Sequence, residues 1–126
     1  PVAGIAAGLT ILEQNRPTAE LTGILTCDAP ASWRALPALH RALLGAGRDL
    51  EGVCTRDGDH TQYLLGLYHR RALAAATTPG GTPLRDVAVR RVLGSLRVAT
   101  LALPHGIVRD LDTWAEVRAW DTDLPE

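Results

Sequence analysis

The sequence predicts an α/β protein in which helices and strands form layers around a mixed sheet. Segments with apolar residues at helical spacing alternate along the chain with short runs of β-forming residues. One Asp-Gly turn, Asp57-Gly58, lies between two extended runs and indicates an antiparallel hairpin. The composition, 46% hydrophobic and 21% charged, is that of a globular protein.

Size and charge exclude several classes of protein. The 126 residues fit one domain without repeats or linkers, so residues 1–126 are treated as a single unit. A formal net charge of −1 argues against a protein that binds nucleic acid by counterion release. No apolar run reaches the roughly 18 residues of a membrane span. The two cysteines, 27 positions apart, form no metal or redox pair, so we expect a cytoplasmic domain.

The first predicted element is a helix over Val2–Leu12. Ile5, Leu9 and Leu12 recur at the i, i+4, i+7 spacing of one helical face. Pro17 cannot continue a helix and biases its predecessor toward extended geometry, so the helix ends before it.

A strand and a second helix follow. Leu21–Cys27 is a short apolar run, which favours a strand buried on both faces with Cys27 as a buried small hydrophobe. Ala35–Leu44 carries leucines at helical spacing, and Gly45 and Gly47 end this helix.

The middle of the chain predicts a hairpin followed by two helices. Glu51–Arg56 and Thr61–Tyr68 are its strands, and the second strand leads into a helix over His69–Ala76. Pro83 suits the first position of a further helix, Leu84–Leu93.

The last elements are a strand and a helix. Arg97–Leu103 is a strand that Pro104 interrupts. Thr113 and Glu116 have the spacing of a capping box, which predicts the start of a final helix.

Asp28 is the most informative polar position. It follows the strand Leu21–Cys27, and ligands of open α/β sheets bind at the carboxyl ends of strands. A carboxylate there suits Mg²⁺, which takes few protein ligands and several phosphate or water oxygens. The alternative is that Asp28 caps the turn into the next helix.

Two further groups are candidates for binding. Asp110 and Asp112 lie two residues apart and so share one face of a strand. Either they converge on one cation or ribose, or they are turn formers before a helix. The loop Gly80–Pro83 precedes a predicted helix start. Either the free amides of that helix start receive an anion, or the segment is simply a loop. Arg85, just after it, is the arginine most suited to phosphate contact.

Four segments, in order, resemble the molybdenum cofactor guanylyltransferase family. They match its "GPLAG"-like helix start, its acidic "D-x-P" strand end, its "QPLLGLY"-like strand and its "N-x-N/D-T-P-E-D-L" ending. Tyr63 replaces the proline usual after Gln62, and Asp110 stands where asparagine is common. The matching segments are PVAG at 1–4, TCDAP at 26–30, DGDHTQYLLGLY at 57–68 and DLDTWAEV at 110–117.

The resemblance implies a three-layer, Rossmann-like fold of the nucleotide-diphosphosugar-transferase type. It implies an enzyme that transfers GMP from GTP to molybdopterin and releases pyrophosphate. Asp28 would hold the catalytic Mg²⁺ or Mn²⁺, and Gly4 would allow the backbone to approach the nucleotide. Asp110 and Asp112 match positions near the pterin side of the cleft.

The family's glycine-rich loop, of "LAGGxSxRMGxDK" type, has no match, and the chain contains no lysine. Because that loop neutralises the triphosphate, we expect residues 1–126 to be the C-terminal part of a nucleotidyltransferase-like domain, incomplete at its N-terminus and inactive alone. Two alternatives stay open. One is a related enzyme that uses CTP or another acceptor. The other is a non-catalytic remnant that binds a molybdoenzyme or a second copy through an unpaired sheet edge.

Overall fold

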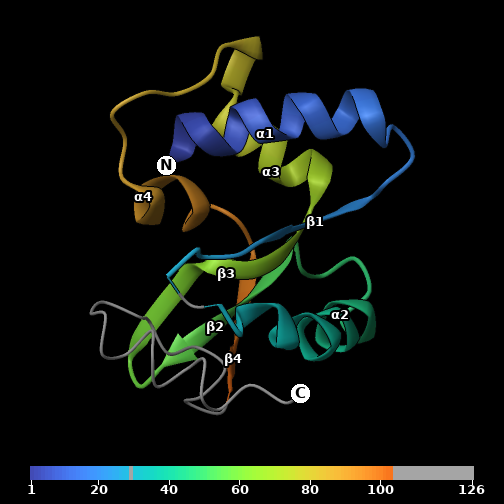
Figure 1. Ribbon diagram of the computed structural model, residues 1–126, viewed down its shortest axis with the longest axis vertical. Helices are drawn as coiled ribbons and strands as arrows, with labels where there is room; N and C mark the ends of the chain where they lie inside the picture. Colours follow the sequence, from blue (N-terminus) through green and yellow to red (C-terminus); the bar gives the residue numbers. More distant parts are fainter. Residues whose placement is uncertain (29, 104–126) are drawn as a thin grey trace.

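The computed structural model describes residues 1–28 and 30–103, which form a four-stranded mixed sheet covered by helices (Figure 1). The strand order is β1-β3-β2-β4. The strands are β1 (Leu21–Ile24), β2 (Gly52–Asp57), β3 (His60–His69) and β4 (Val98–Ala102).

The centre of the sheet is the predicted hairpin. Strands β2 and β3 pair antiparallel as far as Asp57 and His60, and Gly58 in the turn between them has a φ of 58°. That left-handed backbone favours glycine. β1 adds antiparallel to β3, and β4 adds parallel to β2, which makes the sheet mixed as predicted.

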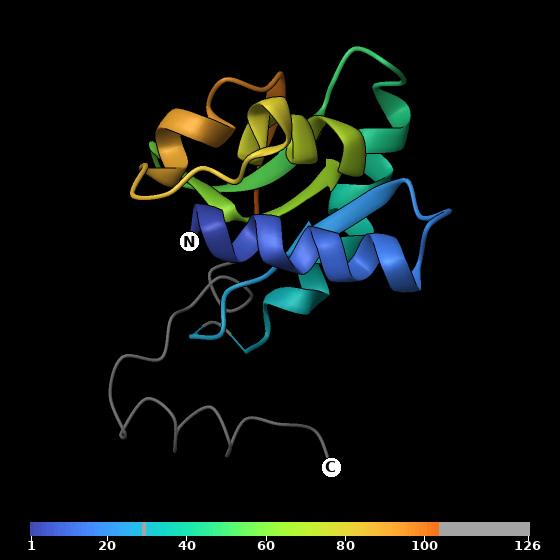
Figure 2. The same ribbon diagram turned by 90° about the horizontal axis from the view of Figure 1, so that it is seen from above.

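Helices cover both faces of this sheet. Figures 1 and 2 show α1, α3 and α4 over one face and α2 over the other. The three-layer α/β architecture is therefore confirmed. The helices are α1 (Val2–Asn15), α2 (Leu36–Gly45), α3 (Arg70–Thr77) and α4 (Val89–Leu93), with 3₁₀ turns η1 (Ser32–Ala35) and η2 (Pro79–Gly81).

Each face has its own apolar core. On the α1 side, Leu9, Leu73 and Leu93 pack with Cys54 and Tyr68 of the sheet. On the α2 side, leucines of the helix pack against the opposite faces of the same strands. The second core consists of Ala35, Leu39, Leu43, Val53, Leu65 and Leu67.

A bulge in β3 shapes the sheet near its middle. Cys54 pairs with Gly66 but the next residue, Thr55, pairs with Gln62, so β3 has extra residues between these pairs. The Tyr68 hydroxyl donates a hydrogen bond to the Tyr63 carbonyl oxygen at 2.6 Å. This bond spans the bulge and ties its start to the regular part of the strand.

The first strand differs from its prediction. β1 ends at Ile24 rather than at Cys27, and it pairs with β3 alone among the described strands. Its residues are half-buried or exposed, so it is an edge strand and not one buried on both faces. An apolar run identifies a strand, but only tertiary neighbours decide how far each face is covered.

The helix predicted over Leu84–Leu93 is also wrong in its first half. Asp86 has a φ of 55°, and the Leu84 amide donates to the Thr77 carbonyl at 2.9 Å instead of starting a helix. Ala88 is extended, and helix α4 begins only at Val89. Proline is well tolerated at the first position of a helix, but it does not by itself start one. Here the hydrogen bond from the Leu84 amide to the Thr77 carbonyl holds the backbone in another conformation.

The other predicted helices and strands are confirmed, with their ends shifted by a turn or less. The capping box of Thr113 and Glu116 lies outside the described residues. Within residues 1–28 and 30–103, no helix is both long enough and apolar enough to cross a bilayer.

Candidate functional site

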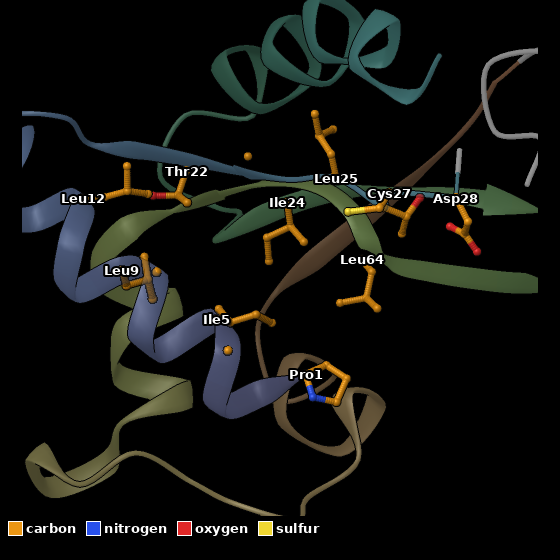
Figure 3. A pocket seen from close by; sticks show the side chains of 14 residues that line it. Pro1, Ile5, Leu9, Leu12, Thr22, Ile24, Leu25, Cys27, Asp28 and Leu64 are labelled. Carbon is orange, nitrogen blue, oxygen red and sulfur yellow. The ribbon is translucent and has the colours of Figure 1, made fainter. Parts of the chain in front are cut away.

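A cavity of about 660 Å³ lies between α1 and the chain from Thr22 to Asp28 (Figure 3). Helix α1 forms one wall and β1 with the segment after it forms the other. Its lining residues are Pro1, Gly4, Ile5, Gly8, Leu9, Leu12, Thr22, Gly23, Ile24, Leu25, Thr26, Cys27, Asp28 and Leu64.

This cavity brings together two candidates that lie far apart in the sequence. Gly4 is in the first turn of α1, and Asp28 follows β1, yet both line the same cavity. Asp28 is exposed, and Figure 3 shows it at the end of the cavity away from Leu12. The cavity is thus apolar along most of its length and carries a carboxylate at one end.

Glycines keep the helix wall open. A Cβ atom built on Gly4 or Gly8 meets nothing within 4 Å. The absence of side chains there leaves the backbone of α1 accessible from the cavity. The close approach of this backbone to a nucleotide, which the sequence resemblance implies for Gly4, stays a prediction.

The apolar walls include a residue that sequence reasoning missed. Figure 3 shows Leu64 opposite Ile5 of α1, on the same side of the cavity as Ile24. Leu64 lies within the β3 bulge, and a strand with regular pairing would not have these extra residues. No pattern in the sequence predicts a register shift at this point.

Asp28 suits a cation that takes most of its ligands from elsewhere. It supplies the one carboxylate among the cavity-lining residues. Among residues 1–28 and 30–103, no group of three or more His, Cys, Asp or Glu side chains is arranged to enclose a metal. This donor set fits Mg²⁺ or Mn²⁺ bound through one carboxylate plus phosphate and water oxygens.

The described residues show no side-chain cap on the helices that follow Asp28. Neither η1 nor α2, the two helices that follow it, has a side-chain hydrogen bond at its N-terminus. The Asp28 carboxylate is therefore not committed to either of these helix starts.

The other candidates lie elsewhere. Arg85 is exposed and lines a separate cavity of about 250 Å³ with Asp86 and the first residues of α1, not the cavity of Asp28. Gly80 and Gly81 have φ values of 66° and 86° in an exposed loop. Because α4 begins at Val89, the predicted helix start after this loop is missing, and the anion site proposed there loses its basis.

Asp110 and Asp112 lie outside the described residues. Their convergence on a cation, a ribose or a pterin therefore stays a prediction.

The two thiols lie in opposite environments. Cys27 is exposed, so its prediction as a buried hydrophobe is wrong. Cys54 is fully buried at the centre of the sheet beside Tyr68. Burial raises the pKa of the Cys54 thiol from 9.0 to about 11, although the Tyr68 hydroxyl opposes this shift.

This difference predicts selective thiol chemistry. At pH 8 an aromatic disulfide reagent should titrate one thiol in the native protein and both after denaturation, because only thiolates react and Cys54 is both buried and protonated. Cys27→Ala should abolish the native reaction, whereas Cys54→Ala should leave it unchanged. Rapid modification of both thiols in the native state would contradict the buried position of Cys54.

The same pKa has a consequence for stability. A thiol whose folded pKa is raised favours the folded state below pH 9, and this contribution declines as the pH rises toward about 11. Burial also raises the pKa of Tyr68. Deprotonation of that hydroxyl at high pH therefore also lowers the stability of the folded state.

Comparison with known proteins shows the fold. The chain resembles the crystal structure of molybdopterin-guanine dinucleotide biosynthesis protein A from Archaeoglobus fulgidus, with a TM-score of 0.60 and 17% sequence identity. The alignment covers 94% of this chain but only 60% of the archaeal one. No protein-family model matches the sequence. No curated protein matches it either.

Proposed function

We propose that this chain is part of a molybdenum cofactor guanylyltransferase-like enzyme, which transfers GMP from GTP to molybdopterin and releases pyrophosphate. The observation that carries the proposal is the shared cavity of Gly4 and Asp28. These residues belong to two separate motifs of the sequence resemblance. The likeness in fold to a protein of molybdopterin-guanine dinucleotide biosynthesis supports it.

In this proposal the residues of the cavity have distinct roles. Asp28 holds the divalent cation, which supplies charge neutralisation and a template for the phosphates. Gly4 lets the first turn of α1 come close to the nucleotide, because no side chain fills the space in front of it. Outside this cavity, Arg85 is a secondary candidate for contact to phosphate, and Asp110 and Asp112 are secondary candidates for the pterin side. The proposal places this reaction in the cytoplasm.

Transfer of GMP requires more positive charge than this cavity provides. Displacement at a nucleotide phosphorus depends on positioning and on neutralising the triphosphate. Among the lining residues no Arg or Lys side chain faces the cavity. We therefore expect residues 1–126 to bind Mg²⁺–GTP weakly and to need further polypeptide for turnover.

The test is a nucleotide screen with the product of the complete reading frame. GTP, CTP and ATP are each incubated with Mg²⁺ and molybdopterin, and pyrophosphate and the dinucleotide product are measured. Turnover with GTP supports the proposal. Turnover with CTP alone replaces it with a cytidylyltransferase. A properly folded protein without turnover or nucleotide binding supports the non-catalytic alternative.

A further inference from the structure

A second cavity, of about 460 Å³, lies at the start of β1, whereas the cavity of Gly4 and Asp28 extends past the end of this strand. One wall of the second cavity is the connection between α1 and β1, and the other is the junction between β3 and α3. Its lining residues are Pro17, Thr18, Glu20, His69, Arg70 and Arg71.

Backbone hydrogen bonds hold these two walls together. The Arg70 amide donates to the Glu20 carbonyl oxygen at 2.8 Å, and Leu21 pairs with His69 in the ladder of β1 and β3. The His69 amide in turn donates to the Glu51 carbonyl oxygen at 2.8 Å, just before β2. Both walls are therefore anchored to the sheet.

Positive charge gathers in this cavity. Arg70 and Arg71 bring two guanidinium groups to its lining, next to the imidazole of His69. Glu20 is the one acidic residue among the lining residues. Among the described residues, neither arginine forms an ion pair with Glu20. The cavity thus has more positive than negative charge, without close pairing between the two.

The position of the two arginines on α3 does not help the helix. Arg70 and Arg71 lie in its first turn, where the partial positive charge of the helix end disfavours cations. That turn has no acidic residue, and among the described residues no side chain caps its amides. An anion bound at this point would offset both unfavourable features.

One nitrogen of the Arg70 guanidinium also lacks a partner. Its Nη1 is shielded from solvent and makes no hydrogen bond within the part of the chain that the structure describes. A charged donor without an acceptor costs more free energy than a neutral one. An anion in the cavity would give this guanidinium the acceptor that it lacks.

We propose that this cavity binds a small phosphomonoester through Arg70 and Arg71. The planar guanidinium matches phosphate oxygens in a bidentate geometry, and the ester carries about −1.5 to −2 charges at pH 7 against two guanidinium groups. The cavity is larger than one phosphate group, so the organic part lies against Pro17 and Thr18. This site does not use Asp28 or a nucleotide, so the proposal does not rest on the proposed function.

The probes are phenyl phosphate, inorganic phosphate and benzoate. Each is titrated by calorimetry, without metal or nucleotide, into the product of the complete reading frame and into residues 1–126. Saturable binding of phenyl phosphate is expected in both. Inorganic phosphate should bind more weakly, because it leaves the rest of the cavity empty. Benzoate has a similar ring but one charge, and it should bind about tenfold more weakly or less well still.

Three variants test the charges of the lining. Arg71→Gln should fold, because the side chain is exposed, and its affinity for phenyl phosphate should fall about tenfold or more. The matched control is Arg41→Gln on α2, which removes the same charge at an exposed position away from the cavity lining and should bind like the wild type.

Glu20→Gln should have the opposite effect. It removes the one carboxylate of the lining, so the affinity for phenyl phosphate should rise about two- to fivefold. A purely structural role for Glu20 predicts no such gain. Circular dichroism confirms that all three variants fold.

Three results would overturn the proposal. The first is no saturable binding to the product of the complete reading frame, and binding by residues 1–126 alone would mean that the same polypeptide fills the cavity. The second is an equal effect of Arg71→Gln and Arg41→Gln, which would make the binding a general attraction to positive charge. The third is tighter binding of inorganic phosphate than of phenyl phosphate, which would make the free ion the ligand.

Discussion

Asp28→Asn is expected to lower turnover of Mg²⁺–GTP by about a hundredfold or more in the product of the complete reading frame. The amide keeps the size of the side chain but loses the charge that would hold the cation in the proposed function. Because Asp28 is exposed and caps neither η1 nor α2, the variant should remain as stable as the wild type. Steady-state kinetics at varied Mg²⁺ should show a raised metal requirement.

The matched control is Asp59→Asn, which removes one carboxylate from the exposed hairpin turn, away from the cavity lining. Its turnover and metal dependence should equal those of the wild type. If Asp28→Asn and Asp59→Asn behave alike, Asp28 is not a metal ligand. A direct titration of Mn²⁺ by electron paramagnetic resonance gives the same comparison without turnover.

Gly66→Ala is expected to lower the free energy of unfolding by about 2 kcal/mol or more. A Cβ at Gly66 would lie 2.9 Å from the Cys54 Cβ, 2.9 Å from Tyr68 Cε2 and 3.0 Å from the Tyr68 hydroxyl oxygen. All these partners are buried in the α1-side core, so none moves away cheaply. Urea denaturation followed by circular dichroism measures the loss.

Two comparisons test the cause of that loss. Gly45→Ala, at the end of α2, meets nothing within 4 Å and should be neutral or slightly stabilising. In a Tyr68→Leu background, the additional cost of Gly66→Ala should be smaller, because the ring is gone and only the contact to the Cys54 Cβ at 2.9 Å is left. An equal cost in both backgrounds would show that crowding against Tyr68 is not the reason.

Most of the secondary structure could be predicted because it depends on local signals. The Asp57-Gly58 turn defines the hairpin, and the spacing of Ile5, Leu9 and Leu12 defines α1, whatever the rest of the chain does. The wrong predictions depend on distant partners. The half-exposed position of β1 follows from its place at the sheet edge, which apolar composition alone does not reveal.

The candidate site could be predicted only in part, for the same reason. Asp28 and Gly4 were found through motifs, and the structure places both on one cavity. Leu64 was missed because its position depends on a register shift between β2 and β3. Cys27 was misjudged because a single residue after an apolar run has no signal that distinguishes the end of a strand from its interior.

The strand order also determines when each part of the sheet is able to form. β2 and β3 follow each other directly, so the hairpin closes at little entropic cost. β1 comes earlier in the chain, but its described partner is β3, and their ladder runs up to the Leu21–His69 pair. During synthesis on the ribosome, β1 therefore waits without its ladder until the chain has been made as far as His69, with its apolar residues open to chaperones.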